Sequence, residues 1–465
     1  MSAALASGAH VIPCYIDARD EEAPWSPGAA SRWWLHGALE SLDAELHARG
    51  SRLVIRRGPT VTALEQLIEE TGASAVYWNR LYDPSYMARD QNVKVELKAR
   101  GIEALSFNAA MLLEPWQLAT QAGTPFRVFT AFWRTLSARL DQVPPCAATP
   151  GTLHPVPATI SSLRLADLGL LPQIPWTQGM SAAWDTSEHG AQKALARLKD
   201  EVVADYAAQR DLPGRQGTSR LSPNLHFGQL GPRQILHSLR GPQRKDQRIC
   251  AGAADTFLRQ VGWRDFAHYL LFHFPETPEQ PFQPLFKGLP VRQDAVALER
   301  WQRGRTGIPL VDAGMRELWE TGWMHNRVRM VVASFLTKNL GIHWSQGARW
   351  FWETLVDADL ANNTMGWQWT AGCGADAAPY YRIFNPVAQG ERFDPEGKYI
   401  RRWVAELARL PDRWIAQPWK APPEVLRTAG VDLGRSYPRP VVDLAVSRGQ
   451  ALAAYQTLRA SRARP

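Results

Sequence analysis

The chain has 465 residues, of which 45% are hydrophobic and 21% charged, and this length predicts more than one domain. No apolar run is long enough to cross a bilayer, which argues against a membrane-spanning protein and against a membrane partner. The formal net charge of +8 favours a polyanionic partner, although an arginine-rich genome explains the same charge equally well.

The N-terminal part of the chain alternates between short apolar strands and amphipathic helices. Strands are predicted at residues 10–16, 51–57, 74–78 and 103–107, and helices at residues 29–49, 59–70 and 89–101. This alternation is the βαβ rhythm of an open parallel sheet, as in Rossmann-like domains. Proline-rich pieces then follow, and they predict a long linker.

The remainder of the chain is predicted to be helical. Helices are expected at residues 192–210, 232–239, 253–271, 312–321, 325–340, 350–360 and 392–407. The predicted fold class is therefore an α/β N-terminal domain followed by a large all-α domain. We expect the α/β domain at residues 1–115, the linker at 116–187 and the helical domain at 188–465.

The cysteines and the first residues bear on the compartment. Cys14, Cys146, Cys250 and Cys373 lie far apart and form no C-x-x-C pair, which argues against a zinc site and a disulfide framework. The first residues lack the basic start and apolar core of a secretory signal. Both observations predict a protein of the reducing cytoplasm.

Residues 344–382 hold five of the 20 tryptophans, the acids Asp357 and Asp359, and a polar stretch at 362–364 that predicts a turn. Core packing explains any one of these tryptophans. It does not explain why acids, amides and tryptophans gather at one helix end.

Three further segments contain chemistry-bearing side chains. Thr218, Ser219 and Ser222 have hydroxyls that can donate to phosphate oxygens, with an ordinary helix cap as the alternative. Gln260 and Trp263 share a helical face, on which they either hold a base or pack in the core.

The third segment, residues 323–330 (WMHNRVRM), places Arg327 and Arg329 on different faces of one helix. One arginine can meet a buried carboxylate while the other reaches a phosphate. A solvated basic helix end is the alternative.

Together these segments resemble the photolyase/cryptochrome family. TSRLSP, GWRDF, TGWMHNRVRM, ADLANN, GWQW, DAAPYYRIFNP and FDPEGKYIRRW occur in the family's order and spacing over nearly the whole chain. The strongest likeness is to bacterial cyclobutane pyrimidine dimer photolyases of class I or III. The resemblance implies FAD as cofactor and light-driven DNA repair by electron transfer from excited reduced FAD. It also implies damaged DNA as partner, a monomer, and a bacterial cytoplasmic location at the nucleoid.

The resemblance assigns roles to individual positions. The residues implied to hold FAD are Tyr206, Thr218, Ser219, Arg220, Leu221, Ser222, Phe257, Arg264, Asn326, Arg329, Asp357, Ala358, Asp359 and Asn363. The residues implied to receive the flipped-out dimer are Gln260, Trp263, Asn326, Met330 and Trp369. Arg327 and Arg382 are implied to contact phosphates, and a pairing of Arg329 with Asp357 would keep a buried charge compensated. Asn363 is implied to face flavin N5 and to be catalytic, a neutral amide suiting an anionic reduced flavin.

The chain departs from the family in three ways. Trp367 and Trp344 match the proximal and middle members of its electron-relay triad, but the distal position is Val291, which cannot hold a radical cation. Trp301, Trp350 or Trp352 are the candidate substitutes. Gln260 stands where dimer-repairing members usually have glutamate, which puts repair efficiency in doubt.

The third departure lies in the α/β domain. The first strand of the family's sheet and its arginine-rich turn have no counterpart, so either the true start lies upstream or the domain lacks a strand. This domain houses the antenna chromophore of the family. We expect methenyltetrahydrofolate first and a deazaflavin second.

Alternatives within and beyond enzymes stay open. A six-four photolyase would carry histidines in place of Asn326 and Met330. A cryptochrome-like blue-light receptor is favoured by Gln260 and Val291, and is opposed by Asn363 and by an expected lack of a signalling tail. A flavin-storage protein with decayed activity is the third alternative.

Overall fold

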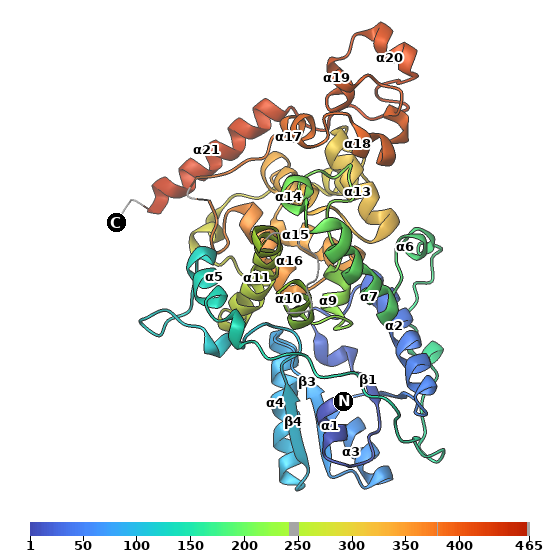
Figure 1. Ribbon diagram of the computed structural model, residues 1–465. Helices are drawn as coiled ribbons and strands as arrows, with labels where there is room; N and C mark the ends of the chain where they lie inside the picture. The colour runs from blue at the N-terminus through green and yellow to red at the C-terminus, as the bar shows by residue number, and fades with distance from the viewer. Residues whose placement is uncertain (241–250, 379, 463–465) are drawn as a thin grey trace. The chain divides into compact units, whose positions relative to one another are not determined.

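The computed structural model describes residues 1–240, 251–378 and 380–462 (Figure 1). The chain divides into two compact units. Unit 1 comprises Met1–Thr177, Trp184–Glu201 and Ser219–Pro275, and unit 2 comprises Gln178–Ala183, Val202–Thr218 and Glu276–Pro465. In the described part of the chain, no helix is both long and apolar enough to cross a membrane.

Unit 1 contains the predicted strands and the helices between them. The strands are β1 Cys14–Asp17, β2 Val54–Arg57, β3 Ala75–Asn79 and β4 Glu103–Phe107. The helices are α1 Ser2–Ala6, α2 Ala29–Ala48, α3 Thr60–Thr71, α4 Pro84–Ala99, α5 Phe129–Ser137, α7 Glu188–Arg197, α9 Ser222–His226, α10 Pro232–Arg240 and α11 Ala251–His273. The α/β prediction for the N-terminal part is thus confirmed.

The four strands form two parallel pairs instead of one open sheet. β1 pairs with β2 in the register Cys14↔Val54, and β3 pairs with β4 in the register Ala75↔Glu103. No described strand joins β1 to β3. The connections still follow the parallel rule, because α2 crosses over between β1 and β2 and α4 crosses over between β3 and β4.

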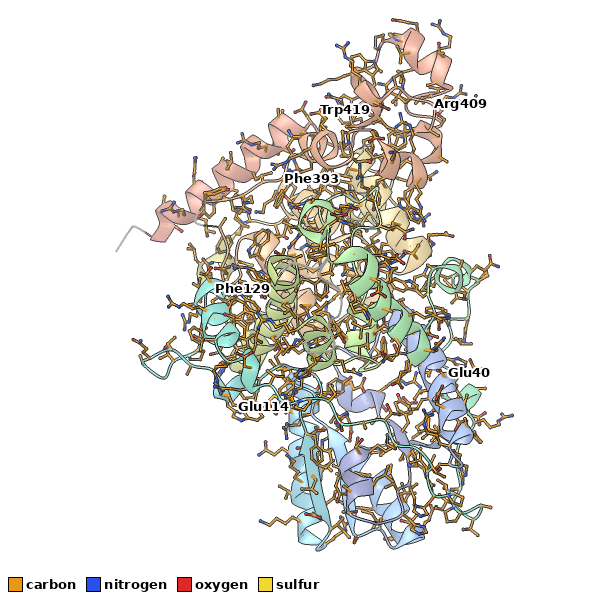
Figure 2. The ribbon with its side chains drawn as sticks, viewed as in Figure 1. Glu40, Glu114, Phe129, Phe393, Arg409 and Trp419 are labelled. Carbon is orange, nitrogen blue, oxygen red and sulfur yellow. The ribbon has the colours of Figure 1, made fainter. Side chains whose placement is uncertain are left out.

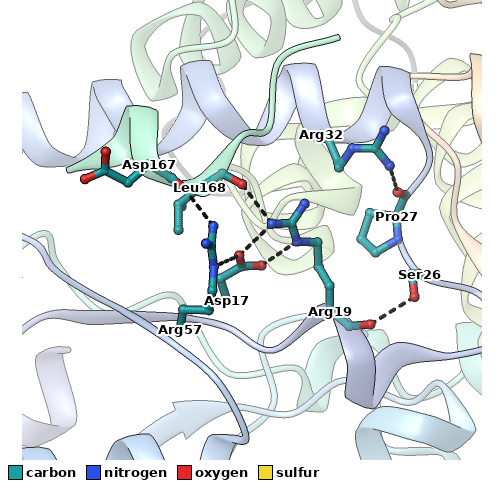
Figure 3. Close-up of polar contacts among 8 residues, drawn as sticks. All are labelled: Asp17, Arg19, Ser26, Pro27, Arg32, Arg57, Asp167 and Leu168. Atoms are coloured by element: carbon teal, nitrogen blue, oxygen red, sulfur yellow. Dashed lines mark hydrogen bonds and ion pairs between the residues drawn. The ribbon is translucent and has the colours of Figure 1, made fainter. Parts of the chain in front are cut away.

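An ion-pair cluster closes the carboxyl ends of β1 and β2 (Figure 3). The buried carboxylate of Asp17 accepts from Nε and Nη2 of Arg19, both at 2.8 Å, and from Nε of Arg57 at 3.1 Å. The same arginines donate to the carbonyl oxygens of Leu168 and Asp167. Side chains of the two strand ends therefore tie down the segment around residue 167.

The predicted linker 116–187 carries two helices, α5 in unit 1 and α6 Gln178–Ala183 in unit 2. Phe129, labelled in Figure 2, lies on α5 and stacks on Trp263 of α11 with ring centroids 3.6 Å apart. A Cβ atom at Gly262 would lie 2.3 Å from the Trp133 ring, so glycine permits this close approach of α5 to α11. The proline-rich stretch thus adds apolar surface to the core of unit 1.

Unit 2 is helical. Besides α6, its helices are α8 Tyr206–Gln209, α12 Ala295–Gln302, α13 Pro309–Thr321, α14 Asn326–Ser334, α15 Trp344–Thr354, α16 Leu360–Ala371, α17 Pro386–Phe393, α18 Lys398–Trp403, α19 Asp412–Ile415, α20 Pro423–Ala429 and α21 Leu444–Arg462. A π-helical turn, η7 (Phe335–Asn339), extends α14. α13, α14, α15 and α16 pack together in the middle of this unit (Figure 1).

The prediction of one helix over residues 350–360 was wrong. α15 ends at Thr354, and α16 begins at Leu360 because the Asp359 side chain accepts from the backbone N–H of Asn362 at 2.8 Å. The polar residues 362–364, predicted as a turn, form the first turn of α16.

Two other long predicted helices are also interrupted. Residues 192–210 divide into α7, a π-helical turn η5 (Leu198–Val202) and α8. Residues 392–407 divide because the Asp394 carboxylate accepts from the N–H groups of Tyr399 and Ile400, which begins α18 afresh. Polar caps, which apolar periodicity does not register, set these boundaries.

Candidate functional site

The charged centre of unit 2 is the pair of Arg329 on α14 and Asp357 in the loop before α16. Nη2 of Arg329 donates to both carboxylate oxygens of Asp357, at 3.0 and 2.8 Å. Nε of Arg329 donates to the carbonyl oxygen of Met324 at 2.8 Å. Since the Asp357 side chain is only 3% exposed, the guanidinium compensates a buried charge. The predicted pairing of these two residues is present.

The first turn of α16 presents an amide next to this pair in sequence. Asp359 caps the helix, and Ala358 is fully buried before it. Nδ2 of Asn363 donates to the carbonyl oxygen of Ala348 on α15 at 3.0 Å. Its Oδ1 accepts no hydrogen bond from any described residue, so the amide keeps one acceptor available.

The predicted electron carriers lie on α15 and α16. Trp367 and Trp344 are 2% and 5% exposed. A Cβ atom at Gly347 would lie 2.0 Å from Cη2 of Trp367, so this ring packs directly on α15 one turn after Trp344. Gly347, which sequence reasoning did not single out, thus permits the close approach of the Trp367 ring to α15.

A third tryptophan also contacts Trp367. Trp301 on α12 is fully buried, its ring centroid is 6.1 Å from that of Trp367, and its Nε1 donates to the carbonyl oxygen of Val332 on α14. Val291, at the predicted distal position, is 42% exposed. Trp350 stacks on Trp319, and that pair makes no ring contact with Trp367 among the described rings.

The start of α14 presents the other predicted lesion-pocket residues of unit 2. Asn326 is exposed at the first helical position, and Met330 is half-buried one turn later. Arg327 forms an ion pair with Asp211 at 2.9 Å and lies over the ring of Phe393. A DNA phosphate at the predicted contact would compete with the Asp211 carboxylate for Arg327, because this carboxylate already neutralises part of the arginine's charge.

Trp369, implied to line the lesion pocket, and Arg382, implied to contact phosphates, lie in contact with each other. The guanidinium carbon of Arg382 lies 5.5 Å from the ring centroid of Trp369 and 5.3 Å from that of Tyr380. Nε1 of Trp369 donates to the carbonyl oxygen of Asp376 at 3.1 Å, which fixes the indole. Arg382 forms no ion pair with any described residue, so its charge remains available to an anion.

The predicted phosphate-binding residues are split between the units. In unit 2, Tyr206 is buried on α8 under Arg210, and Thr218 ends the segment. In unit 1, Ser219 and the exposed Ser222 flank Arg220 and the fully buried Leu221. Arg220 has a φ of 55°, and its guanidinium lies over the Trp184 ring. The left-handed conformation at Arg220 turns the chain sharply just before α9.

α11 carries the remaining predicted residues of unit 1. Phe257 is buried, Gln260 is half-buried without a partner among the described residues, and Trp263 has one face on Phe129. One face of the Trp263 ring thus packs in unit 1, the ring is not fully buried, and its contact with a base stays a prediction. Nη1 of Arg264 donates to the carbonyl oxygen of Ala110.

The next residue on α11, Asp265, was missed by sequence reasoning. It is 1% exposed, accepts from the N–H of Leu112 at 2.8 Å, and burial raises its pKa to about 6. Its signal was a carboxylate placed inside an apolar helical face. It anchors the loop around residue 112 to α11.

The side chains of unit 2 fit a flavin in their chemistry. Nε1 of Trp367 is buried without a hydrogen-bond partner among the described residues, and Oδ1 of Asn363 accepts no hydrogen bond from them. Arg329, Asn326 and Asn363 supply donors and acceptors of the kinds that a ribityl chain and an isoalloxazine edge require. In unit 1, the hydroxyls of Ser219 and Ser222 suit phosphate oxygens.

Comparisons with known proteins agree with this chemistry. Residues 257–457 match the family model described as the FAD binding domain of DNA photolyase, and residues 1–151 match the model described as DNA photolyase. The chain is 43% identical to a deoxyribodipyrimidine photo-lyase of Agrobacterium fabrum, over 98% of the chain and 94% of that protein. It is 40% identical to cryptochrome-2 of Arabidopsis thaliana, over 96% of the chain and 75% of that protein.

A solved structure gives the same result for the fold. A bacterial class III photolyase from Agrobacterium tumefaciens superposes with a TM-score of 0.94 at 43% identity, over 98% of this chain and 94% of that one. Identity at this level over nearly full length, together with the two family models, settles the family. The chain belongs to the FAD-binding photolyase/cryptochrome family.

Proposed function

We propose that this chain is a deoxyribodipyrimidine photo-lyase, which uses light to split cyclobutane pyrimidine dimers in DNA. The observation that carries the proposal is the stacking of Arg382 on Trp369. An indole supplies a flat apolar wall for an extruded pyrimidine dimer, and a guanidinium without an ion-pair partner among the described residues supplies a phosphate contact without sequence preference. A signalling flavoprotein needs neither.

Bound FAD, in its reduced form and excited by light, would supply the electron that opens the cyclobutane ring. The chain's own residues set the electrostatics around it. Arg329 neutralises Asp357, so no uncompensated carboxylate lies there. Asn363 offers an uncharged acceptor, which suits a protonated N5 and adds no negative charge next to a reduced flavin.

The lesion pocket proposed for unit 2 consists of Asn326, Met330 and Trp369. The exposed amide of Asn326 can hydrogen-bond a thymine edge, while Met330 and Trp369 supply apolar contact. Gln260 and Trp263 of unit 1 are proposed to take part as well. A glutamine at position 260 keeps hydrogen bonding but lacks the charge of the usual glutamate, so we expect Gln260→Glu to raise the repair yield.

A light-dependent repair assay tests the proposal. Chemically reduced, FAD-loaded protein is mixed with an oligonucleotide containing one thymine dimer, and dimer loss is measured in blue light and in the dark. We expect the wild-type protein to remove dimers in blue light and Trp369→Leu to remove far fewer. The matched control is Trp319→Leu, which removes a 43% exposed tryptophan elsewhere in unit 2. Absence of any light-dependent loss in the wild-type protein would refute the proposal.

A cryptochrome-like photoreceptor is the second candidate, and Gln260 and Val291 favour it. The same oligonucleotide distinguishes the two, because a photoreceptor without repair activity has no reason to prefer dimer-containing DNA over undamaged DNA. A photo-lyase binds the damaged strand more tightly, and its affinity falls steeply with salt as phosphate contacts are screened.

The antenna chromophore, the monomeric state and the bacterial cytoplasmic, nucleoid-associated location stay predictions. A folate is proposed first and a deazaflavin second. At the carboxyl ends of β1 and β2, Arg19 and Arg57 are already bonded to Asp17 and to backbone carbonyls. These two arginines therefore have few donors left for an antenna chromophore. The absorbance of the chromophore in purified protein is the direct test.

A further inference from the structure

A buried lysine lies behind the pocket wall of unit 2 and has no role in the function proposed above. Lys338 is 3% exposed and sits in the π-helical turn η7. None of the described carboxylates forms an ion pair with it. An unpaired ammonium in an apolar interior is costly, so contacts other than an ion pair must account for it.

Two such contacts are present, and both come from the segment of residues 380–384. Nζ of Lys338 donates to the carbonyl oxygen of Arg382 at 3.1 Å, across 44 residues of sequence. The same Nζ lies 3.6 Å from the ring centroid of Tyr381, well within the range of a cation–π interaction. The ammonium thus grips the backbone of Arg382 and the side chain next to it.

The remaining anchors of this segment are neutral. Oγ of Ser334 accepts from the N–H of Phe384 at 3.1 Å, and the ring of Tyr381 stacks on that of Tyr455 at 4.4 Å. Lys338 also lines a small cavity with Trp369, Arg382 and Phe384. The lysine therefore borders the same small cavity as both members of the Arg382–Trp369 stack.

We propose that Lys338 is a positioning residue for lesion binding, whose ammonium clamps the 380–384 segment so that Arg382 stays stacked on Trp369. This inference rests on the proposed function for its consequence in repair, but the clamp itself is a property of the protein alone. Lys338 contacts neither cofactor nor DNA in this role.

The clamp depends on the charge of Lys338. Burial lowers its pKa to about 7, and the Cys373 thiol beside it acts in the opposite direction. The other titratable or charged groups around it are Tyr381 and Arg382 from the segment and Tyr455 from α21. Loss of the proton removes the cation–π contact and weakens the hydrogen bond, so the segment loosens as pH rises above 7.

Hydrogen exchange on the FAD-loaded full chain, without DNA, tests the clamp. We expect the amides of residues 380–384 to lose roughly tenfold in protection in Lys338→Met, the loss expected for one buried cation–π contact. In the wild-type protein, the protection of this segment should fall between pH 6 and 9. In Lys338→Met, the protection should show no such step. The matched control is Lys287→Met, which removes an exposed lysine of the same unit.

A second pair of variants serves where Lys338→Met does not fold. Tyr381→Phe keeps the ring face and should behave like the wild-type protein, whereas Tyr381→Leu removes it and should loosen the segment. Equal protection in the wild-type protein and in Lys338→Met, or in the two Tyr381 variants, overturns the clamp. Loosening without weaker binding of dimer-containing DNA overturns its role in lesion binding, and a wild-type protein that repairs nothing overturns the proposed function instead.

Discussion

The helical stretch formed by α14 and η7 carries two bases, the half-buried Arg329 and the buried Lys338, in opposite surroundings. Arg329 faces the carboxylate of Asp357, at 2.8 Å. Lys338 faces a carbonyl oxygen and the ring of Tyr381. One base is compensated by a full opposite charge and the other only by dipoles and a quadrupole. Burial lowers the pKa of Lys338 to about 7, so this base can lose its charge near neutral pH.

Removing Arg329 is the strongest way to break this comparison. Arg329→Met leaves Asp357 buried without its partner, and we expect a loss of about 3–5 kcal/mol in the free energy of unfolding. Bound FAD should fall with it. Urea denaturation and the flavin absorbance of purified protein measure both effects.

The double variant Arg329→Met/Asp357→Asn is the control. Because it removes both charges, it should regain a large part of the lost stability. If the double variant is as unstable as the single one, the loss comes from packing, and the contrast between the two bases is of little energetic importance.

The pH dependence of stability sharpens the comparison from the side of Lys338. Its folded-state pKa is lowered to about 7 from 10.5, so between these values the unfolded chain holds a proton that the folded chain does not. The free energy of unfolding should therefore rise with pH by up to about 1.4 kcal/mol per unit above pH 7. The difference in urea midpoint between the wild-type protein and Lys338→Met isolates the contribution of this group. This difference should change with pH above pH 7 and become independent of pH below it.

This global trend runs opposite to the local one expected for residues 380–384. Deprotonation ends the cost of burying an ammonium and at the same time removes its grip on the segment. A protein that becomes more stable while one wall of its pocket loosens is a signature that nonspecific alkaline unfolding does not produce.

Adding a carboxylate near the compensated base is a milder change. In Asn363→Asp a third acid joins Asp357 and Asp359 around the proposed flavin, and like-charge repulsion of about 1 kcal/mol disfavours an anionic reduced form. This corresponds to a midpoint potential about 20 mV more negative for a two-electron couple. A spectroelectrochemical titration measures the shift, and an unchanged potential would argue against placing residue 363 at flavin N5.

The smallest effect on repair is expected from Val291→Trp. The exposed Val291 cannot carry a radical, so a tryptophan there should speed photoreduction of oxidised FAD while leaving repair by chemically reduced protein unchanged. Trp301, whose Nε1 donates to the Val332 carbonyl and whose ring contacts that of Trp367, is the competing carrier. If the wild-type protein and Val291→Trp photoreduce at the same rate, and Trp301→Phe slows both, Trp301 has taken over the relay.

The contrast between the bases also shows what sequence could predict. The Arg329–Asp357 pair was expected from motif resemblance, and it is present. The clamp was not expected, since the bond from Lys338 to Arg382 spans 44 residues and no local pattern encodes it. A weak signal existed, because a lysine seven residues after Val331 and three after Phe335 falls on the buried stripe of the helix.

The predictions of helix boundaries failed because hydrogen bonds from polar side chains, which apolar periodicity does not register, set these boundaries. Apolar periodicity continued across residues 350–360, but the chain leaves the helix at Leu355 and re-enters it where Asp359 caps Asn362. An aspartate directly before an apolar helical pattern, as Asp359 stands before Leu360, is a helix-start signal. The strands were well predicted, and their division into two pairs was not, because pairing depends on which strands meet in space.

The contact between Gly347 and Trp367 couples two positions that are distant in the sequence. Since the indole occupies the volume of any side chain at position 347, the two residues can change only in concert: a larger residue at 347 requires a smaller one at 367. In related chains, a side chain at the position of Gly347 would therefore mark proteins in which the indole at the position of Trp367 has moved or disappeared. If Trp367 carries the electron as predicted, this glycine can be scored from sequence as a companion of that carrier.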